Sequence, residues 1–124
     1  MNLVDSCGWL EYFAEGPNAS FFGEAIEDVD RLLVPTICLL EVFKRIFQQR
    51  GESAALRAVT HMQEGRVVSL DTATALTAAR ISADMKLPLA DSVILATARA
   101  HDAVVWTQDA HFESVPGVQY NAKR

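Results

Sequence analysis

The stretch LPLADSVILATARA, residues 87–100, decides the fold because it has the composition of a helix that is buried on most of its circumference. From Leu89 to Ala98 almost every residue is apolar or small, and Pro88 suits the start of a helix, where a backbone N–H is not needed. Asp91 nevertheless lies in the first turn. Because burying an unpaired carboxylate is costly, Asp91 is expected to be paired, protonated or bound to a metal ion.

Short apolar segments on both sides of this stretch predict strands. They lie at 2–5, 31–34, 66–71 and 103–107, with a weaker one at 118–120. Helical patterns lie between them, at about 6–13, 19–28, 36–50, 53–64 and 72–85. Short apolar strands that alternate with helices indicate a mostly parallel sheet covered on both faces. We therefore expect an α/β fold of three layers, with four to five short strands in one domain spanning residues 1–124.

Local signals place the helix ends. Ser6 is positioned to cap the first helix, and Thr36 is positioned to cap the long one, which Gly51 ends. Within the long helix, three large apolar residues repeat at helical spacing: Leu40, Phe43 and Phe47.

Composition limits the function classes. The chain has 124 residues, half of them apolar, and a formal net charge of −5. A general nucleic-acid binder normally carries a basic face, so any activity on RNA has to overcome this negative field locally. Cys7 and Cys38 lack metal-type spacing and are expected to be reduced, buried thiols. No apolar run reaches the roughly 20 residues that span a bilayer, and the start lacks a signal-peptide pattern, so we expect a cytoplasmic protein.

Two acids stand where predicted strands end. Asp5 closes the first strand, and Asp109 follows the last residue of the fourth strand, Thr107, by two positions. Because ligands bind beyond the carboxyl ends of strands in open α/β sheets, both acids are expected to face one crevice. The plainer alternative is that each caps a helix or a turn.

Two further acids interrupt apolar helices. Glu41 lies within ICLLEVF, and Asp91 heads the 87–100 stretch. Alternatively, Glu41 pairs with Arg45 one turn later, and Asp91 interacts with the helix dipole. Like charges share a buried site only when a cation is present. Carboxylates without a Cys or His cluster favour Mg²⁺ or Mn²⁺, ions that act chiefly on phosphate esters.

Four segments resemble the PIN-domain ribonucleases, specifically toxins of the VapC type. They are LVDSCGW at 3–9, Glu41 in its helix, LPLADSVILATA at 87–98 and TQDAHF at 107–112. The resemblance implies a PIN-like fold and a catalytic, metal-binding set. That set is Asp5, Glu41, Asp91 and Asp109, with Ser6 and Thr107 in supporting positions. Asp109 matches the most variable of the four acids.

The resemblance also implies a function. It predicts a Mg²⁺- or Mn²⁺-dependent endoribonuclease, the toxin of a toxin-antitoxin pair, which forms homodimers and is inhibited by a small antitoxin protein. The expected substrates are tRNA or ribosomal RNA loops. Arginines around the crevice would attract the phosphates, and the candidates are Arg31, Arg45, Arg57, Arg80 and Arg99. The alternatives are a phospho-accepting receiver domain, or a PIN-type binding module without catalysis.

Overall fold

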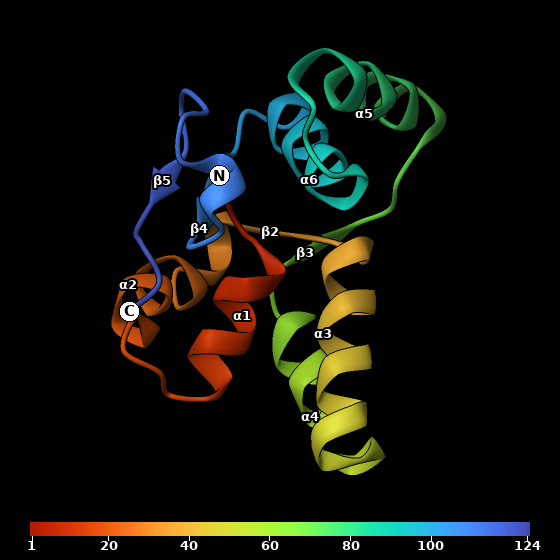
Figure 1. The fold of residues 1–124 in the computed structure, drawn as a ribbon. Helices are drawn as coiled ribbons and strands as arrows, with labels where there is room; N and C mark the ends of the chain where they lie inside the picture. The colour runs from red at the N-terminus through yellow and green to blue at the C-terminus, as the bar shows by residue number, and fades with distance from the viewer.

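A parallel sheet of five strands forms the centre of the computed structural model, which describes residues 1–124 (Figure 1). The strands, in the spatial order β3-β2-β1-β4-β5, are β1 Asn2–Val4, β2 Leu32–Pro35, β3 Arg66–Val68, β4 Val104–Thr107 and β5 Gln119–Tyr120. The helices are α1 Ser6–Phe13, α2 Ala19–Ile26, α3 Thr36–Arg50, α4 Glu52–Met62, α5 Thr72–Met85 and α6 Leu89–Ala100. Two short 3-10 turns are η1 Val29–Arg31 and η2 Ala110–Phe112.

The strand order determines which helices share a face of the sheet. The chain moves outward from β1 through β2 to β3, and then crosses back to β4 on the other side of β1. Because such crossovers are right-handed, the helices of the first two connections lie on one face and α5 and α6 on the other. Figure 1 shows this arrangement, with α5 and α6 above the sheet and α1, α3 and α4 below it. The predicted three-layer fold is confirmed.

The same order creates a crevice between two neighbouring strands. β1 pairs in parallel with both β2 and β4, so the direction of strand addition reverses between β1 and β4. Ligands of open α/β sheets bind outside the carboxyl ends of the strands at such a reversal. Receiver domains have the order 2-1-3-4-5, which differs from the order here. The topology therefore excludes the receiver alternative.

The predicted strands and helices are all present, with ends shifted by a few residues. The central strands are the most buried, with Leu3, Val4 and Leu33 fully inaccessible to solvent. In α6 every residue from Ser92 to Ala98 is buried, as the apolar run predicts. Gly51 ends α3 with a φ of 85°, a conformation that glycine adopts without strain. No helix is both long and apolar enough to cross a membrane.

Two predicted helix caps are wrong. Asp5, not Ser6, is the N-cap of α1, and its carboxylate accepts a hydrogen bond from the Ser6 backbone N–H. At α3 the N-cap is Pro35, with no side-chain hydrogen bond, and Thr36 is already helical. In both cases the strand runs almost directly into the helix. The N-cap, which keeps an extended backbone, is therefore the residue before the serine or threonine.

The apolar repeat in α3 marks the helix but does not mark its buried face. Leu40 and Phe47 are 64% and 49% exposed. The buried positions of α3 are Cys38, Val42 and Ile46. These three residues also recur every four positions, and their row faces the core. Leu40 and Phe47 consequently leave an apolar surface on the outside, whereas Phe43 packs partly against the core.

Candidate active site

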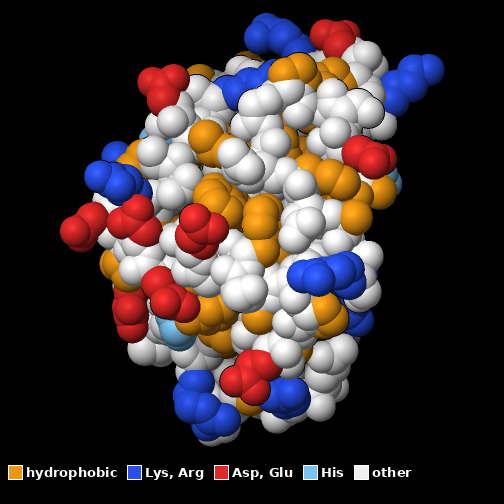
Figure 2. All heavy atoms as spheres, turned by 90° about the vertical axis from the view of Figure 1, so that its left-hand side faces the viewer, with side chains coloured by type: hydrophobic (Ala, Val, Ile, Leu, Met, Phe, Trp, Pro, Cys, Tyr) orange, Lys and Arg blue, Asp and Glu red, His pale blue; other side chains and the backbone are white.

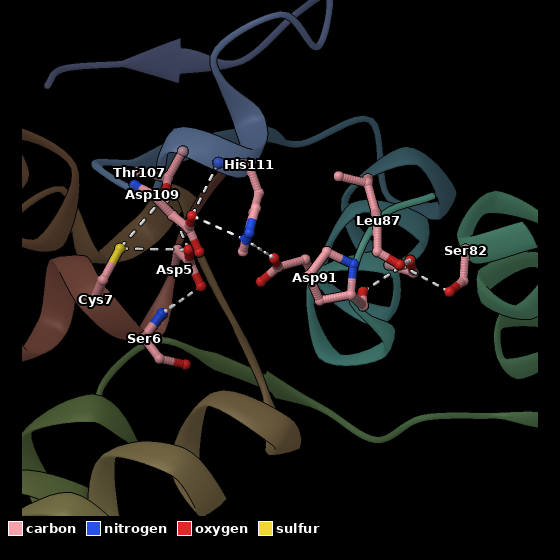
Figure 3. Close-up of polar contacts among 11 residues, drawn as sticks. Asp5, Ser6, Cys7, Ser82, Leu87, Asp91, Thr107, Asp109 and His111 are labelled. Atoms are coloured by element: carbon pink, nitrogen blue, oxygen red, sulfur yellow. Dashed lines mark hydrogen bonds and ion pairs between the residues drawn. The ribbon is translucent and has the colours of Figure 1, made fainter. Parts of the chain in front are cut away.

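Asp5 lies in the crevice at the carboxyl end of β1. Its backbone N–H donates to the Trp106 carbonyl at 3.0 Å, which extends the pairing of β1 and β4 by one residue. Its side chain accepts hydrogen bonds from the Ser6 N–H at 2.7 Å and from the Thr107 hydroxyl at 2.9 Å, one on each oxygen (Figure 3). Asp5 is only 4% exposed. These bonds fix one orientation of a buried carboxylate.

Thr107 connects the two strand-end acids. Besides donating to Asp5, its hydroxyl oxygen accepts a hydrogen bond from the Asp109 backbone N–H at 3.0 Å. The Cys7 sulfur lies 3.4 Å from an Asp5 oxygen and 3.4 Å from the Thr107 hydroxyl. Burial, followed by the Asp5 charge, raises the pKa of Cys7 to about 12. Cys7 is therefore a neutral thiol and a hydrogen-bond donor. A neutral thiol is a poor nucleophile.

Glu41 joins this group through Ser6. The Ser6 hydroxyl donates to Glu41 Oε1 at 2.6 Å, while the backbone N–H of the same residue donates to Asp5. Glu41 forms no ion pair with Arg45. The pairing alternative for Glu41 is therefore wrong, and the helix α3 presents this carboxylate to the crevice.

Asp91 and Asp109 meet at His111, which lies in η2. The Nδ1 atom of His111 is 3.0 Å from an Asp91 oxygen and 3.1 Å from an Asp109 oxygen, so the ring donates to carboxylates (Figure 3). The His111 backbone N–H also donates to Asp109 at 2.9 Å. One possible ligand atom from each of the three residues lies within 4.8 Å of the others.

Hydrogen bonds at the start of α6 hold Asp91 in place. The hydroxyl of Ser82 in α5 donates to the Leu87 carbonyl at 2.8 Å, which ties the α5–α6 connection to α5. The Ser92 hydroxyl donates to the Pro88 carbonyl at 3.0 Å. These two hydrogen bonds fix the first turn of α6, and the Asp91 carboxylate projects from that turn towards Asp5 and Asp109 (Figure 3).

The site concentrates negative charge. Burial, together with the Glu41 carboxylate, raises the pKa of Asp5 against the opposing hydrogen bonds from Thr107, Cys7 and Ser6. Burial, followed by the charges of Asp109 and Asp5, raises the pKa of Asp91 to about 6. No Lys or Arg forms an ion pair with any of the four acids. Carboxylate oxygens that no Lys or Arg neutralises fit a hard divalent ion.

Replacing Thr107 by valine tests how far Asp5 depends on its hydroxyl donor. Thr107→Val is expected to lower the free energy of unfolding by about 1–2 kcal/mol at pH 8, because a buried carboxylate loses a hydrogen bond. The pKa of Asp5 then rises further, so the cost shrinks as pH falls and Asp5 becomes protonated. Thr97→Val is the matched control, because the Thr97 hydroxyl donates only to the Val93 carbonyl. Urea unfolding across pH checks this, and a cost that is independent of pH contradicts it.

Ser6 and Thr107 link three of the four predicted acids, and His111 lies between Asp109 and the fourth, Asp91. Asp91 and Asp109, with His111, have ligand atoms close enough to share one ion, and Asp5 and Glu41 are not in that group. Asp5, Ser6 and Glu41 form one hydrogen-bonded chain, and Thr107 extends it to Asp109. The sequence did not single out the bridging position of His111, because nothing local shows that its ring reaches Asp91. The one local signal for a role of His111 in the site is that it follows Asp109, an acid at a strand end, by two positions.

Comparisons with known proteins agree on the fold. The family model described as PIN domain matches residues 3–118. A toxin-antitoxin complex from Klebsiella pneumoniae is similar, with a TM-score of 0.80 and 22% identity over 95% of each chain. The sarcin-ricin loop cleaving toxin VapC20 from Mycobacterium tuberculosis also has a TM-score of 0.80, with 15% identity over 96% of this chain and 98% of that one.

A third similar structure is the DNA-bound VapBC from Salmonella typhimurium, with a TM-score of 0.75 and 18% identity over 98% of both chains. No curated relative matches the sequence. At these identities the solved structures show a shared fold, while the family model matches almost the whole sequence. The chain belongs to the PIN domain family.

Proposed function

We propose that this chain is a metal-dependent endoribonuclease that acts as the toxin of a toxin-antitoxin pair. One observation carries the proposal. Carboxylates from four separate segments, Asp5, Glu41, Asp91 and Asp109, gather outside the β1–β4 switch point, and no Lys or Arg neutralises them. Asp5, Glu41, Asp91 and Asp109 would hold Mg²⁺ or Mn²⁺. The similar structures support the proposal, because one is a toxin-antitoxin complex and another is a toxin that cleaves the sarcin-ricin loop.

The protein's contribution to the chemistry is to position its carboxylates. A divalent ion supplies Lewis acidity towards a phosphoryl oxygen and lowers the pKa of bound water. Ser6 holds Asp5 and Glu41 in fixed relative positions, and Thr107 holds Asp5 and Asp109. A preorganised set of this kind needs no side chain to become covalently attached to the substrate. The neutral Cys7 thiol is consistent with that mechanism.

The proposed partners follow from the same function. RNA, such as tRNA or ribosomal RNA loops, is the proposed substrate, and a small antitoxin protein is the proposed inhibitor in the cytoplasm. A homodimer is proposed as the assembly. Large apolar side chains at the surface support contacts with other chains, and the most exposed are Leu89, Leu40, Leu76, Leu56 and Phe47.

Cleavage of RNA by the purified chain tests the function. In Mg²⁺ or Mn²⁺ we expect cleavage that leaves 5′-phosphate and 3′-hydroxyl ends, and in chelator we expect none. Those ends distinguish attack by water from attack by the neighbouring 2′-hydroxyl, which leaves a cyclic phosphate. Sequencing the ends produced in expressing cells identifies the RNA. Cleavage that persists in chelator contradicts the proposal, and RNA binding without cleavage in either metal supports the alternative of an inactive PIN-type binding module.

A further inference from the structure

A groove of about 610 Å³ runs beside the acid site, which is a size typical of ligand sites. Its walls come from α1, α3 and α4, which lie next to one another in Figure 1. Gln108, directly after β4, and Lys123, near the C-terminus, complete the lining. None of the proposed catalytic acids lines this groove.

The groove is basic in an acidic protein. Four of the 11 Lys and Arg residues line it, whereas only one of the 16 Asp and Glu residues does. The four cations are Arg45 and Arg50 of α3, Arg57 of α4, and Lys123. Figure 2 shows a different face, on the side that carries α2 and β5, where acidic side chains gather along one edge around apolar patches. Lys and Arg side chains also occur on that face, interspersed with the acidic ones, whereas in the groove they outnumber acids by four to one.

These cations are available to a ligand. None of the four forms an ion pair within the chain. The one acid in the lining, Glu11, accepts a hydrogen bond from the Asn18 backbone N–H at 2.8 Å and pairs with none of these cations. Unpaired cations facing one concavity attract a polyanion.

Aromatic rings lie in the same groove. Phe13 and His61 both line it, with ring centroids 5.5 Å apart. Tyr12 contacts both of these rings and lines the adjoining pocket on the other side. Cations beside aromatic rings are the combination that binds the phosphates and bases of an RNA strand. An acidic peptide with apolar side chains would also fit this lining, which includes Leu10 and Ile46, and its binding is therefore one outcome of the test.

The groove ends at the acid site. Cys7 lines it, and the Cys7 sulfur lies 3.4 Å from an Asp5 oxygen. Gln108, between Thr107 and Asp109 in the chain, accepts a hydrogen bond from buried Asn18 at 3.0 Å. Asn18 also donates to the Ala122 carbonyl at 3.0 Å, which holds the segment that carries Lys123 beside the groove.

We propose that this groove guides an RNA strand to the carboxylates, with Arg45 and Arg57 contacting phosphates and Phe13 and His61 stacking on bases. The proposal deepens the proposed function and rests on it. Of the five candidate arginines, Arg45 and Arg57 line the groove, whereas Arg31, Arg80 and Arg99 do not. A local basic groove is how a chain of net charge −5 can bind a phosphate backbone.

The test compares two double variants with the same change in net charge. Arg45→Gln with Arg57→Gln alters the groove, and Arg31→Gln with Arg80→Gln is the control. All four side chains are exposed, so both variants are expected to fold. The probe is a short fluorescent single-stranded RNA of mixed sequence, with binding measured in chelator over a range of salt. We expect the groove variant to bind about tenfold more weakly than the control, and the slope of log K against log salt to fall by about 1.4.

Cleavage kinetics in Mn²⁺ separate this proposal from the proposed function. The groove variant is expected to raise KM about tenfold with kcat unchanged, because it loses phosphate binding and not the reacting groups. If both double variants bind and cleave alike, the groove proposal is overturned and the nuclease assignment stands. If wild type does not cleave, the nuclease assignment fails, whatever the groove binds. If the groove variant loses only its affinity for an antitoxin protein, the groove is a protein-binding site and the proposal is overturned.

Discussion

Asp91→Asn is expected to abolish RNA cleavage, with a loss of about a thousandfold or more in rate, while the fold stays intact. The amide has the shape of the carboxylate and can still accept the hydrogen bond from His111. It lacks the negative charge that a divalent ion requires of its ligand. Asp5→Asn is expected to have an equally large effect, because Asp5 is the buried acid to which Thr107 and Ser6 donate.

The control for this prediction is Asp84→Asn. Asp84 is an exposed acid on α5, so its replacement makes the same change in net charge away from the crevice. Cleavage is measured under single-turnover conditions in Mn²⁺, and the thermal midpoint of each variant verifies folding. A purified Asp91→Asn or Asp5→Asn chain that cleaves at the wild-type rate would show that the residue has no place in the chemistry.

The sequence was sufficient to locate the acids, because the signals involved are local. A short apolar run ending in Asp5, and another ending just before Asp109, each define a strand end without reference to the rest of the chain. Parallel topology then brings those ends to one edge of the sheet. Asp91 was noticeable because an acid in a buried helix requires a compensating partner.

The surroundings of those acids could not be predicted in the same way. That Ser6 donates to Glu41 depends on how α1 packs against α3, which no spacing within either helix specifies. His111 reaches Asp91 across 20 residues of chain. The groove beside the acid site is likewise assembled from α1, α3, α4 and the C-terminal segment. Contacts between elements are set by tertiary packing, whereas periodicity reports only the element itself.

The exposed apolar residues of α3 show that sequence periodicity also fails to identify the buried face of a single helix. Leu40 and Phe47 follow helical spacing, but so do Cys38, Val42 and Ile46. Both rows are apolar, so hydrophobic pattern alone cannot decide which one faces the sheet. The helix packs Cys38, Val42 and Ile46 inward, and Leu40 and Phe47 remain as an apolar surface on the outside.

Metal binding is expected to reverse the stability order of wild type and Asp91→Asn. Without metal at pH 8, ionised Asp91 is unfavourable in the fold, because burial and the charges of Asp109 and Asp5 raise its pKa to about 6. An acid whose pKa is raised in the folded state destabilises the fold when it is ionised, and this penalty has its full value at a pH above the folded-state pKa. The penalty disappears as pH falls through about 6 towards the ordinary 3.8. Removing this charge should stabilise the variant by about 1 kcal/mol after solvent screening. The variant should therefore melt about 4 °C higher than wild type at pH 8. At pH 4 the two should melt alike.

In Mn²⁺ the wild-type chain is expected to gain more than the variant. At a hundredfold excess over its dissociation constant, an ion that binds only the folded chain stabilises it by about 2.7 kcal/mol, or about 10 °C for a chain of this size. Asp91→Asn has lost a ligand, so its midpoint should hardly move and should fall below that of wild type. Thermal melts compare wild type with Asp91→Asn in four conditions, which are chelator and Mn²⁺, each at pH 4 and pH 8. A wild-type midpoint unmoved by Mn²⁺, with the variant less stable in chelator, would make Asp91 a structural acid of the α6 N-terminus, stabilised by the helix dipole and by His111 rather than by metal.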